Sequence, residues 1–259
     1  MTRKSRVDLS RDEGLRQGAH KASGLVLRRR EGTAKSQELL LFLRTLGATW
    51  VSAPGAGSAR NRFGGGIEPM VWGEYDLYQS PRRLYLKGVD VREDFLQIRT
   101  ARNSLEMGVK WCGELARRLP AGLENDALLS LLWGSMRNLR AGVAPALLDL
   151  RFAWRWANLW GLAPPLDFCA SCGRPLPERG RADDDLESAS CGSLCRDGVL
   201  CGACGASGGI PLEWEALSSL RMAAMSPLEV FLAWQHRFKP AFGDNSRVLS
   251  GWLYSFLIV

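Results

Sequence analysis

The sequences CASCGRPL (Cys169–Leu176) and GVLCGAC (Gly198–Cys204) each contain a CxxC motif. Two such cysteine hairpins, brought together, place four thiolates at the corners of a tetrahedron, which is the geometry of a closed structural zinc site. A glycine follows each motif (Gly173 and Gly205), and glycine lets the backbone turn tightly enough for amides to point at the sulfur atoms. We therefore predict that a structural Zn²⁺ is bound by Cys169, Cys172, Cys201 and Cys204.

The remaining cysteines leave the ligand set open to alternatives. Cys191 and Cys195 form a CxxxC pair between the two motifs, and this pair could replace one motif, bind a second metal weakly, or remain a spare dithiol. The outer pairs are favoured because their shorter spacing has the lower closure cost. Disulfide bonds are disfavoured because no secretory signal is recognised, so a reducing compartment is expected. Cys112 lies in an apolar helical pattern and is expected to be a buried small hydrophobic residue.

The net charge of +7 is concentrated at the N-terminus. Residues 1–30 contain nine Lys or Arg residues and three acidic residues, so this segment carries +6 and the remaining chain only +1. A polyanionic partner explains this distribution, although for residues 1–21 a disordered solubilising arm explains it equally well. No apolar run is long enough to span a bilayer, and we expect a cytoplasmic protein without membrane contact.

Short alternating segments predict strands in the first third of the chain, and helical periodicity follows after about Phe95. The segment 36–46 is apolar enough to be either a strand or a short helix. Five short strands would form a small closed barrel or a sandwich. Pro145 is expected to open a helix that is apolar on nearly every side and therefore buried. The predicted strands are 24–30, 48–52, 71–79 and 84–91, and the predicted helices are 103–119, 125–139, 146–160, 211–225, 227–238 and 247–257.

Motifs of catalysis are missing from the sequence. There is no GxxxxGK[ST] phosphate-binding loop, and the glycines at 64–66 do not match a dinucleotide-binding pattern. The two histidines, His20 and His236, have no nucleophile or acid arranged near them in sequence. No HxE accompanies the CxxC motifs, which disfavours a deaminase. We expect a protein that is not an enzyme.

Four motifs follow one another along the chain. They are GLVLRRRE (Gly24–Glu31), GSARNRFGGGIEPM with VWGEYDLYQ (Gly57–Gln79), LLDLRFAWRWANLWGLAP (Leu147–Pro164) leading into CASCGRPL, and GVLCGAC. Their collinear order resembles the RecO family of bacterial recombinational-repair mediators, and the resemblance covers roughly residues 22–225. The chain departs from the family at Leu46–Trp50, which replaces a Gly-Lys pattern, and at the added Cys191/Cys195 pair.

This resemblance implies an α+β fold, in which an N-terminal OB-fold β-barrel is followed by an all-α helical domain with an inserted four-cysteine zinc ribbon. The implied parts are a basic disordered arm (1–21), the OB-fold (22–98), the helical domain (99–165 plus 209–259) and the zinc-binding insert (166–208).

The resemblance also implies a nucleic-acid-binding groove on the barrel. Alternation along a strand places Arg28 and Arg30 on one face and Arg29 on the other. Alternation also separates Tyr75 from Trp72 and Tyr78, without deciding which side faces the core. The candidate phosphate contacts are Arg28, Arg30, Lys35, Arg60, Arg62, Arg82 and Arg83, together with Arg29.

The expected function is a non-enzymatic mediator of DNA repair and recombination. It would bind single- and double-stranded DNA and the acidic tail of single-stranded-DNA-binding protein, anneal strands, and help RecR- and RecF-type proteins load recombinase in the nucleoid. An alternative is a zinc-ribbon RNA-binding accessory factor of transcription or translation. The candidate tail-binding residues are two helical pairs, Arg137 with Arg140 and Arg151 with Arg155, and the second pair could equally form internal ion pairs with Asp149, Glu106 or Glu114.

Overall fold

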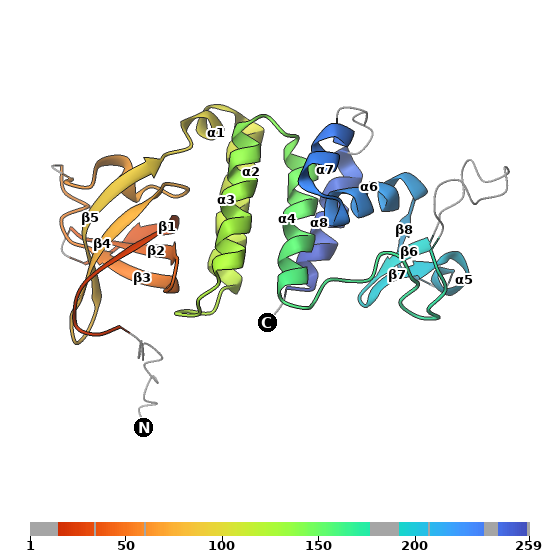
Figure 1. Ribbon diagram of the computed structural model, residues 1–259, viewed down its shortest axis with the longest axis horizontal. Coiled ribbons are helices and arrows are strands. Elements are labelled where there is room, and N and C mark those ends of the chain that lie inside the picture. Colours follow the sequence, from red (N-terminus) through yellow and green to blue (C-terminus); the bar gives the residue numbers. More distant parts are fainter. Residues whose placement is uncertain are drawn as a thin grey trace, which may run out of the picture. The chain divides into compact units, whose positions relative to one another are not determined.

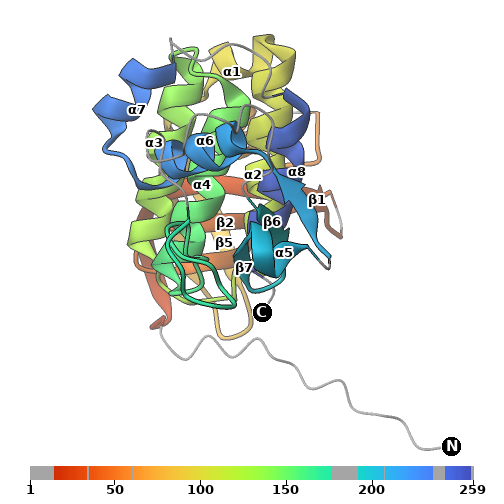
Figure 2. The same ribbon diagram turned by 90° about the vertical axis from the view of Figure 1, so that its right-hand side faces the viewer.

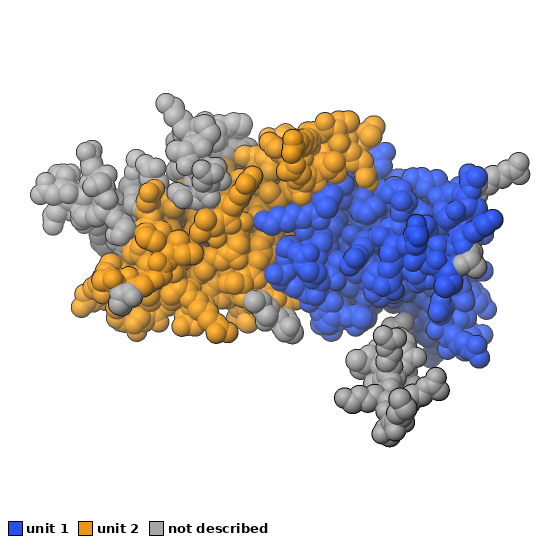
Figure 3. Space-filling model, turned by 180° about the vertical axis from the view of Figure 1, so that it is seen from behind, with its two compact units in different colours: residues 1–95, 109–129 blue, residues 96–108, 130–259 orange. Residues whose placement is uncertain are grey.

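The computed structural model describes residues 15–33, 35–59, 61–176, 192–206, 208–235 and 243–257. The chain forms two compact units, one of residues 1–95 with 109–129 and one of residues 96–108 with 130–259 (Figure 3). In the described ranges, no helix combines the length and the apolar character needed to cross a membrane.

The first unit contains a five-stranded sheet that closes on itself in the order β1-β2-β3-β5-β4 (Figure 1). All neighbouring strands are antiparallel except β3 and β5, which meet in parallel at Ser52 and Tyr85. The long strand β1 pairs with both β2 and β4 and so completes the ring. The strands are β1 (Gly18–Glu31), β2 (Gln37–Leu43), β3 (Gly47–Ala53), β4 (Trp72–Gln79) and β5 (Leu84–Glu93).

Gly24 is the point where β1 passes from one partner strand to the other. It pairs with Leu43 of β2 and with Gly73 of β4. A Cβ at Gly24 would lie 2.1 Å from the carbonyl oxygen of Phe42, so only glycine fits here. A bulge follows between Val26 and Arg28 and bends the strand further.

Alternating side chains fill the interior of the sheet. The ambiguous segment 36–46 contains β2, and its Leu39 and Leu41 belong to the same core cluster as Val51. Tyr75 is fully buried in this cluster, and its hydroxyl donates a hydrogen bond of 2.9 Å to the Val71 carbonyl. A buried phenol that keeps a partner avoids the cost of an unsatisfied hydroxyl. Alternation therefore organises this core as the sequence indicated.

The predicted disordered arm needs one correction. Residues 18–21 lie in β1, where they pair with residues 76–79 of β4. Hydrogen bonds to β4 satisfy the backbone groups of these residues, and this pairing makes them a strand although their own sequence lacks an alternating apolar pattern. Residues 1–14 lie outside the described residues.

A β-sheet domain followed by helices is confirmed by the element order. Helices α2 and α3 each have one end in the first unit and the other end in the second. Cys112 is buried in α2, as predicted. The helices that precede the cysteine motifs are α1 (Leu96–Thr100), α2 (Arg102–Arg118), α3 (Asp126–Arg140) and α4 (Pro145–Leu159).

Helix α4 is the central element of the second unit and contacts α6 (Trp214–Met225) and α8 (Gly243–Ser255) (Figures 1 and 2). Pro145 occupies its first turn, as the sequence predicted. Trp156 is fully buried, and its ring packs edge-on at 5.8 Å from Phe152 and 6.4 Å from Tyr254. Such aromatic pairs add to the stabilisation from buried area. The smaller α7 (Leu228–Gln235) follows α6.

The cysteine motifs belong to a small sheet with the order β7-β6-β8. The prediction that a helix begins at Pro211 is wrong, because 210–212 form β8 and α6 begins only at Trp214. Strand pairing with β6 overrides the helical pattern, and a proline is tolerated on an edge strand. The elements are β6 (Gly192–Cys195), β7 (Gly198–Cys201), the single turn α5 (Gly202–Gly205) and β8 (Ile210–Leu212).

Candidate metal centre and nucleic-acid interface

Four cysteine sulfurs converge at one end of the small sheet. Cys169 and Cys172 come from a tight loop closed by a bridge between Phe168 and Pro175, whereas Cys201 ends β7 and Cys204 lies in α5. The four Sγ atoms all lie within 4.8 Å of one another. The structure therefore brings together the four residues that the CxxC spacing singled out.

The sulfur geometry fits a tetrahedral metal ion. A zinc–tetrathiolate tetrahedron with bonds of about 2.3 Å has sulfur–sulfur edges of about 3.8 Å. The Sγ atoms of Cys172 and Cys201 are 3.8 Å apart, which is far longer than a disulfide bond of about 2.05 Å. The cluster offers four sulfur ligands and no carboxylate, a donor set that suits Zn²⁺ in a closed structural site.

Backbone amides stabilise the charged form of two of these thiols. The amides of Cys172 and Cys201 hold the pKa of the Cys169 thiol down to about 6, and the amide nitrogen of Cys201 lies 3.3 Å from the Cys169 sulfur. The pKa of Cys201 is also lowered, chiefly by the amide of Cys204. A thiolate that accepts amide hydrogen bonds is already in the form that binds metal.

The fourth thiol behaves in the opposite way. Hydrogen bonds with the side chains of Cys172 (the larger contribution) and Cys201 raise the pKa of Cys204 to about 12. Neighbouring sulfurs that carry negative charge oppose the loss of another proton. A bound divalent cation would remove this opposition, so the cluster is suited to hold four thiolates only around a cation.

The two glycines after the motifs have different roles. Gly173 has a φ of +70°, which lets the first loop turn back towards Cys169, as expected. Gly205 instead permits a close approach, because a Cβ there would lie 2.4 Å from the hydroxyl oxygen of Ser193. In β6, Cys195 is outside the four-sulfur cluster, and its carbonyl accepts a 2.7 Å hydrogen bond from the Trp252 indole. Cys191 lies outside the described residues.

Arg28 and Arg30 are exposed on the outer face of the closed sheet. Their cross-strand partners on β2 are Leu40 and Glu38, which alternate with the core residue Leu39. Cross-strand partners share a face, so both arginines point away from the core. The bulge does not disturb this pairing, and two positive charges follow one another along the surface of β1.

Arg29 lies on the opposite side of β1 from these two residues. Its cross-strand partner is the core residue Leu39, and its guanidinium group forms an ion pair with Glu68. Of the three consecutive arginines, this one is therefore neutralised within the unit.

The turn between β4 and β5 presents two further arginines. The Ser80 hydroxyl accepts hydrogen bonds from the amides of Arg82 and Arg83, at 3.3 and 3.0 Å, and so fixes the turn. Both side chains are exposed, and the Arg83 guanidinium lies 3.9 Å from the Glu38 carboxylate. This contact connects the turn with the residue that faces Arg30 on β2.

Lys35 and Arg62 lie in loops of the same unit. Lys35 is exposed with a φ of +60°, and its carbonyl accepts a 2.9 Å hydrogen bond from Gly57. Arg62 is exposed and stacks 4.7 Å from the Phe63 ring, with a long hydrogen bond to the Leu86 carbonyl. Arg60 lies outside the described residues.

Another part of the outer surface is balanced in charge. Lys21 lies 3.3 Å from Glu74, and Arg92 lies 3.4 Å from Glu74 and 3.0 Å from Asp90. The hydrogen bond from Lys21, followed by the charge of Arg92, lowers the pKa of Glu74. A polyanion gains little from cations that are already paired, so this area is a poor nucleic-acid surface.

Among the aromatic residues of β4, Tyr75 faces the core, whereas Trp72 and Tyr78 face outward. Two other outward aromatic residues were not predicted from the sequence: Trp50 on β3 and Tyr85 on β5, which are both partly exposed. Alternation along β3 is the signal that could have found Trp50, because its neighbour Val51 belongs to the core.

The four arginines proposed for partner binding fall into two environments. Arg137 and Arg140 are exposed on α3. Arg151 is buried, and its guanidinium donates hydrogen bonds of 3.0 and 2.9 Å to the carbonyls of Ala223 and Ser226, at the end of α6. Arg155 donates to the same Ser226 carbonyl at 3.1 Å.

Burial is the main cause of lowered pKa values at this corner. It lowers the pKa of Arg151 to about 10, with a further contribution from the charge of Arg155, and it also lowers the pKa of Arg155. The carbonyls at a helix C-terminus carry partial negative charge and offset part of this cost. The Nε of Arg155 is buried without a hydrogen-bond partner. This nitrogen is therefore a hydrogen-bond donor that the described part of the chain leaves unused.

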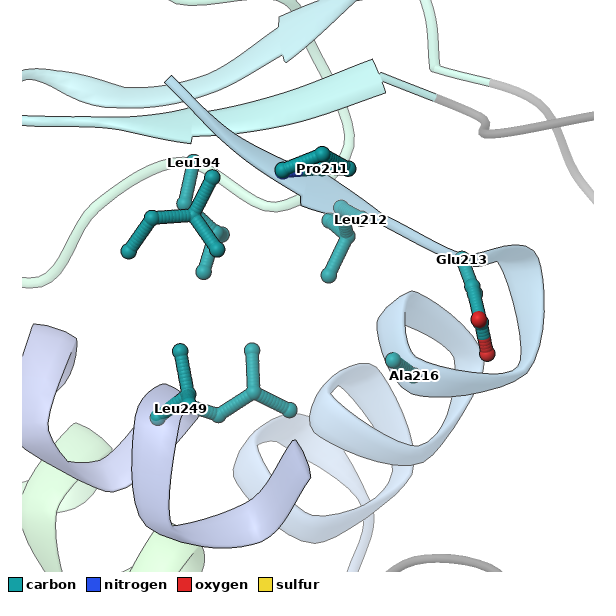
Figure 4. Close-up of a pocket in the computed structure, with 8 residues that line it drawn as sticks. Leu194, Pro211, Leu212, Glu213, Ala216 and Leu249 are labelled. Atoms are coloured by element: carbon teal, nitrogen blue, oxygen red, sulfur yellow. The ribbon is translucent and has the colours of Figure 1, made fainter. Parts of the chain in front are cut away.

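A small pocket of about 120 Å³ lies between the small sheet and helices α6 and α8 (Figure 4). Leu194 and Leu212 line it from the sheet, Leu249 lines it from α8, and Glu213 is its charged residue. None of the four candidate arginines lines this pocket. Its acidic side chain does not favour an acidic peptide.

Comparisons with known proteins show which family this chain is similar to. The profile of the family described as Recombination protein O C terminal matches residues 107–247, which is 141 of the 259 residues. Proteins named DNA repair protein RecO from Rubrobacter xylanophilus and Anaeromyxobacter sp. are 26% and 27% identical over 81% and 88% of this chain, and the alignments cover 82% and 86% of those proteins. A protein of the same name from Exiguobacterium sp. is 27% identical over 59% of this chain, and here the chain spans only 61% of the relative's length.

Proposed function

The chain belongs to the RecO family, and from this premise we propose that it is a mediator of DNA repair and recombination that binds DNA without transforming it chemically. The observation that carries the proposal is the outward pair Arg28 and Arg30, with the exposed arginines of the β4–β5 turn on the same unit. Exposed cations on a closed β-sheet bind the phosphates of single- and double-stranded DNA with little sequence preference. The cyclic strand order supports an OB-fold for this part of the chain.

Charge neutralisation also provides a route to strand annealing. Two complementary strands repel each other, and cations that bind their phosphates reduce this repulsion while leaving base edges free to pair. Annealing by this route needs no catalytic side chain. It would let the protein act in the nucleoid together with RecR- and RecF-type partners that load recombinase.

We assign Zn²⁺ as the structural ion of the four-sulfur cluster. Cys169, Cys172, Cys201 and Cys204 would hold it, and four sulfur ligands leave no position for a reactive water. The zinc would order the insert 166–208, between the parts 99–165 and 209–259 of the helical domain. The OB-fold would occupy 22–98, after a basic arm.

For the acidic, Phe-ending tail of single-stranded-DNA-binding protein, we propose the arginines of the helical unit. The unsatisfied Nε of Arg155 supports a carboxylate acceptor at that corner. Met225, Leu228 and Val230 are exposed along the α6–α7 segment and supply apolar area for an aromatic side chain. A labelled tail peptide should bind, the Arg155→Gln variant should bind it more weakly, and equal binding of a peptide with an amidated C-terminus would refute a carboxylate contact.

A combined binding and annealing assay tests the main proposal. Labelled DNA and RNA strands of the same sequence are titrated with the parent chain, and annealing of complementary DNA strands is followed by energy transfer without nucleotide triphosphates. We expect DNA binding and accelerated annealing, both weakened in the Arg28→Gln/Arg30→Gln variant. Failure to bind DNA would refute the proposal, and a strong preference for RNA would support an RNA-binding accessory factor instead.

A further inference from the structure

Trp50 is a partly exposed aromatic residue on the outer face of β3, within the basic part of the closed sheet. Its cross-strand partner is Leu40, which in turn pairs with Arg28 on β1. The guanidinium carbon of Arg30 lies 4.0 Å from the centroid of the Trp50 ring. An aromatic face and two cations are thus built into one surface of three neighbouring strands.

A second aromatic–cation pair continues this surface. Tyr85 on β5 is the partner of Ser52 on β3 and of Tyr78 on β4, so these residues lie in one row on the outer face. Tyr78 is 37% exposed, and the ammonium group of Lys87 lies 5.2 Å from its ring. Ser52 separates Trp50 from Tyr85 and is itself covered, being only 6% exposed.

The charges of this surface are only partly compensated. Glu38, the cross-strand partner of Arg30, supplies an acidic side chain to this surface, and its carboxylate lies 3.9 Å from the Arg83 guanidinium. In the described part of the chain, Arg30 has no carboxylate within ion-pair distance, and its contact is the indole ring. A cation–π contact at an exposed site is weak enough to be exchanged for a phosphate contact.

We propose that Trp50, Tyr85 and Tyr78 form a base-stacking platform that makes this surface prefer single-stranded DNA to duplex DNA. This inference rests on the proposed function, since it assumes that the basic face binds DNA. An unpaired base takes the ring face of Trp50, and Arg30 moves from that ring to the adjacent phosphate. Bases of a duplex are already stacked on both faces, so a duplex gains only the phosphate contacts.

Two measurements on the parent chain test the platform before any substitution is made. A labelled oligodeoxythymidine is compared with an abasic strand of equal length, which has the same phosphates and no bases. We expect the abasic strand to bind about 5- to 150-fold more weakly, the range for losing one stacked base. An RNA strand of matched sequence forms a further arm, and tighter binding of RNA than of DNA would overturn our choice of DNA.

Substitutions then locate the platform. Trp50→Leu keeps an apolar side chain but removes the ring, and it should weaken oligodeoxythymidine binding at least about fivefold while leaving duplex and abasic binding unchanged. Trp50→Phe keeps an aromatic face and should restore most of the affinity. Tyr78→Leu, at a more exposed position, should weaken binding in the same selective way even if Trp50→Leu fails to fold.

The outcomes separate this inference from the proposed function. Equal binding of abasic and base-containing strands by the parent chain, or an equal loss on both strands in the folded variants, overturns the platform and leaves the DNA-binding function standing. Absence of binding to every strand overturns both.

Discussion

Replacing Cys169 by serine removes one of four sulfur ligands, and the size of the effect can be worked out from the cluster. Structural zinc contributes about 10–16 kcal/mol of apparent binding free energy in zinc-finger peptides at neutral pH. Shared equally among four thiolates, this is about 2.5–4 kcal/mol for each, so the zinc affinity of Cys169→Ser should fall about 10²- to 10³-fold. Cys169 suits this test because its pKa of about 6 leaves the thiol largely ionised, and therefore in the metal-binding form, at neutral pH.

The assay is competition for zinc against a chelator of known affinity, combined with the metal content of the purified chain. Cys195→Ser is the matched control, since this thiol is in the same small sheet but outside the cluster. We expect one zinc per chain in the parent and in Cys195→Ser, and strongly reduced occupancy in Cys169→Ser. Unchanged zinc affinity in Cys169→Ser, or an equal loss in Cys195→Ser, would show that the quartet is assigned wrongly.

Three further predictions concern the fold. Burial raises the pKa of the Tyr75 hydroxyl above its unfolded value of about 10. The stabilisation from this buried phenol is therefore present below about pH 10 and is lost as the pH rises further. The free energy of unfolding, measured in urea, should fall more steeply at alkaline pH in the parent than in Tyr75→Phe, and parallel curves would contradict this. Gly24→Ala should cost roughly 3 kcal/mol, because its Cβ would meet the Phe42 carbonyl, whereas Gly65→Ala has open space and should melt like the parent. Arg151→Met should lower stability by about 2–3 kcal/mol in thermal melts, since it leaves two carbonyls at the end of α6 without this donor, and an unchanged melting temperature would refute that role.

Local patterns were sufficient for much of the fold. Alternation predicted that Arg28 and Arg30 share one face of their strand and that Arg29 lies on the other, because strand pleating has a fixed period of two. The two CxxC motifs predicted the sulfur cluster, because short hairpins with this spacing close at little entropic cost. Pro145 indicated the start of α4, because its fixed φ suits a first helical turn.

Features that depend on residues far apart in the sequence could not be predicted from local patterns. The strand at residues 18–21 exists because β4 pairs with it, and the strand at Pro211 exists because β6 does. The neutralisation of Arg29 by Glu68 and the stacking of Arg30 on Trp50 join residues far apart in the sequence. Only the three-dimensional pairing shows which cations remain available for a polyanion.

The salt dependence of DNA binding tests the central claim most directly. A labelled single strand is titrated at several salt concentrations with the parent, with Arg28→Gln/Arg30→Gln, and with Lys21→Gln/Arg92→Gln, which removes the same charge from cations already paired with acids. Each phosphate contact on a single strand contributes about 0.7 to the slope of log affinity against log salt. We predict that the first variant lowers this slope by about 1.4 and that the second leaves it near the parent value. Equal slopes for the parent and Arg28→Gln/Arg30→Gln would contradict binding of DNA by this face.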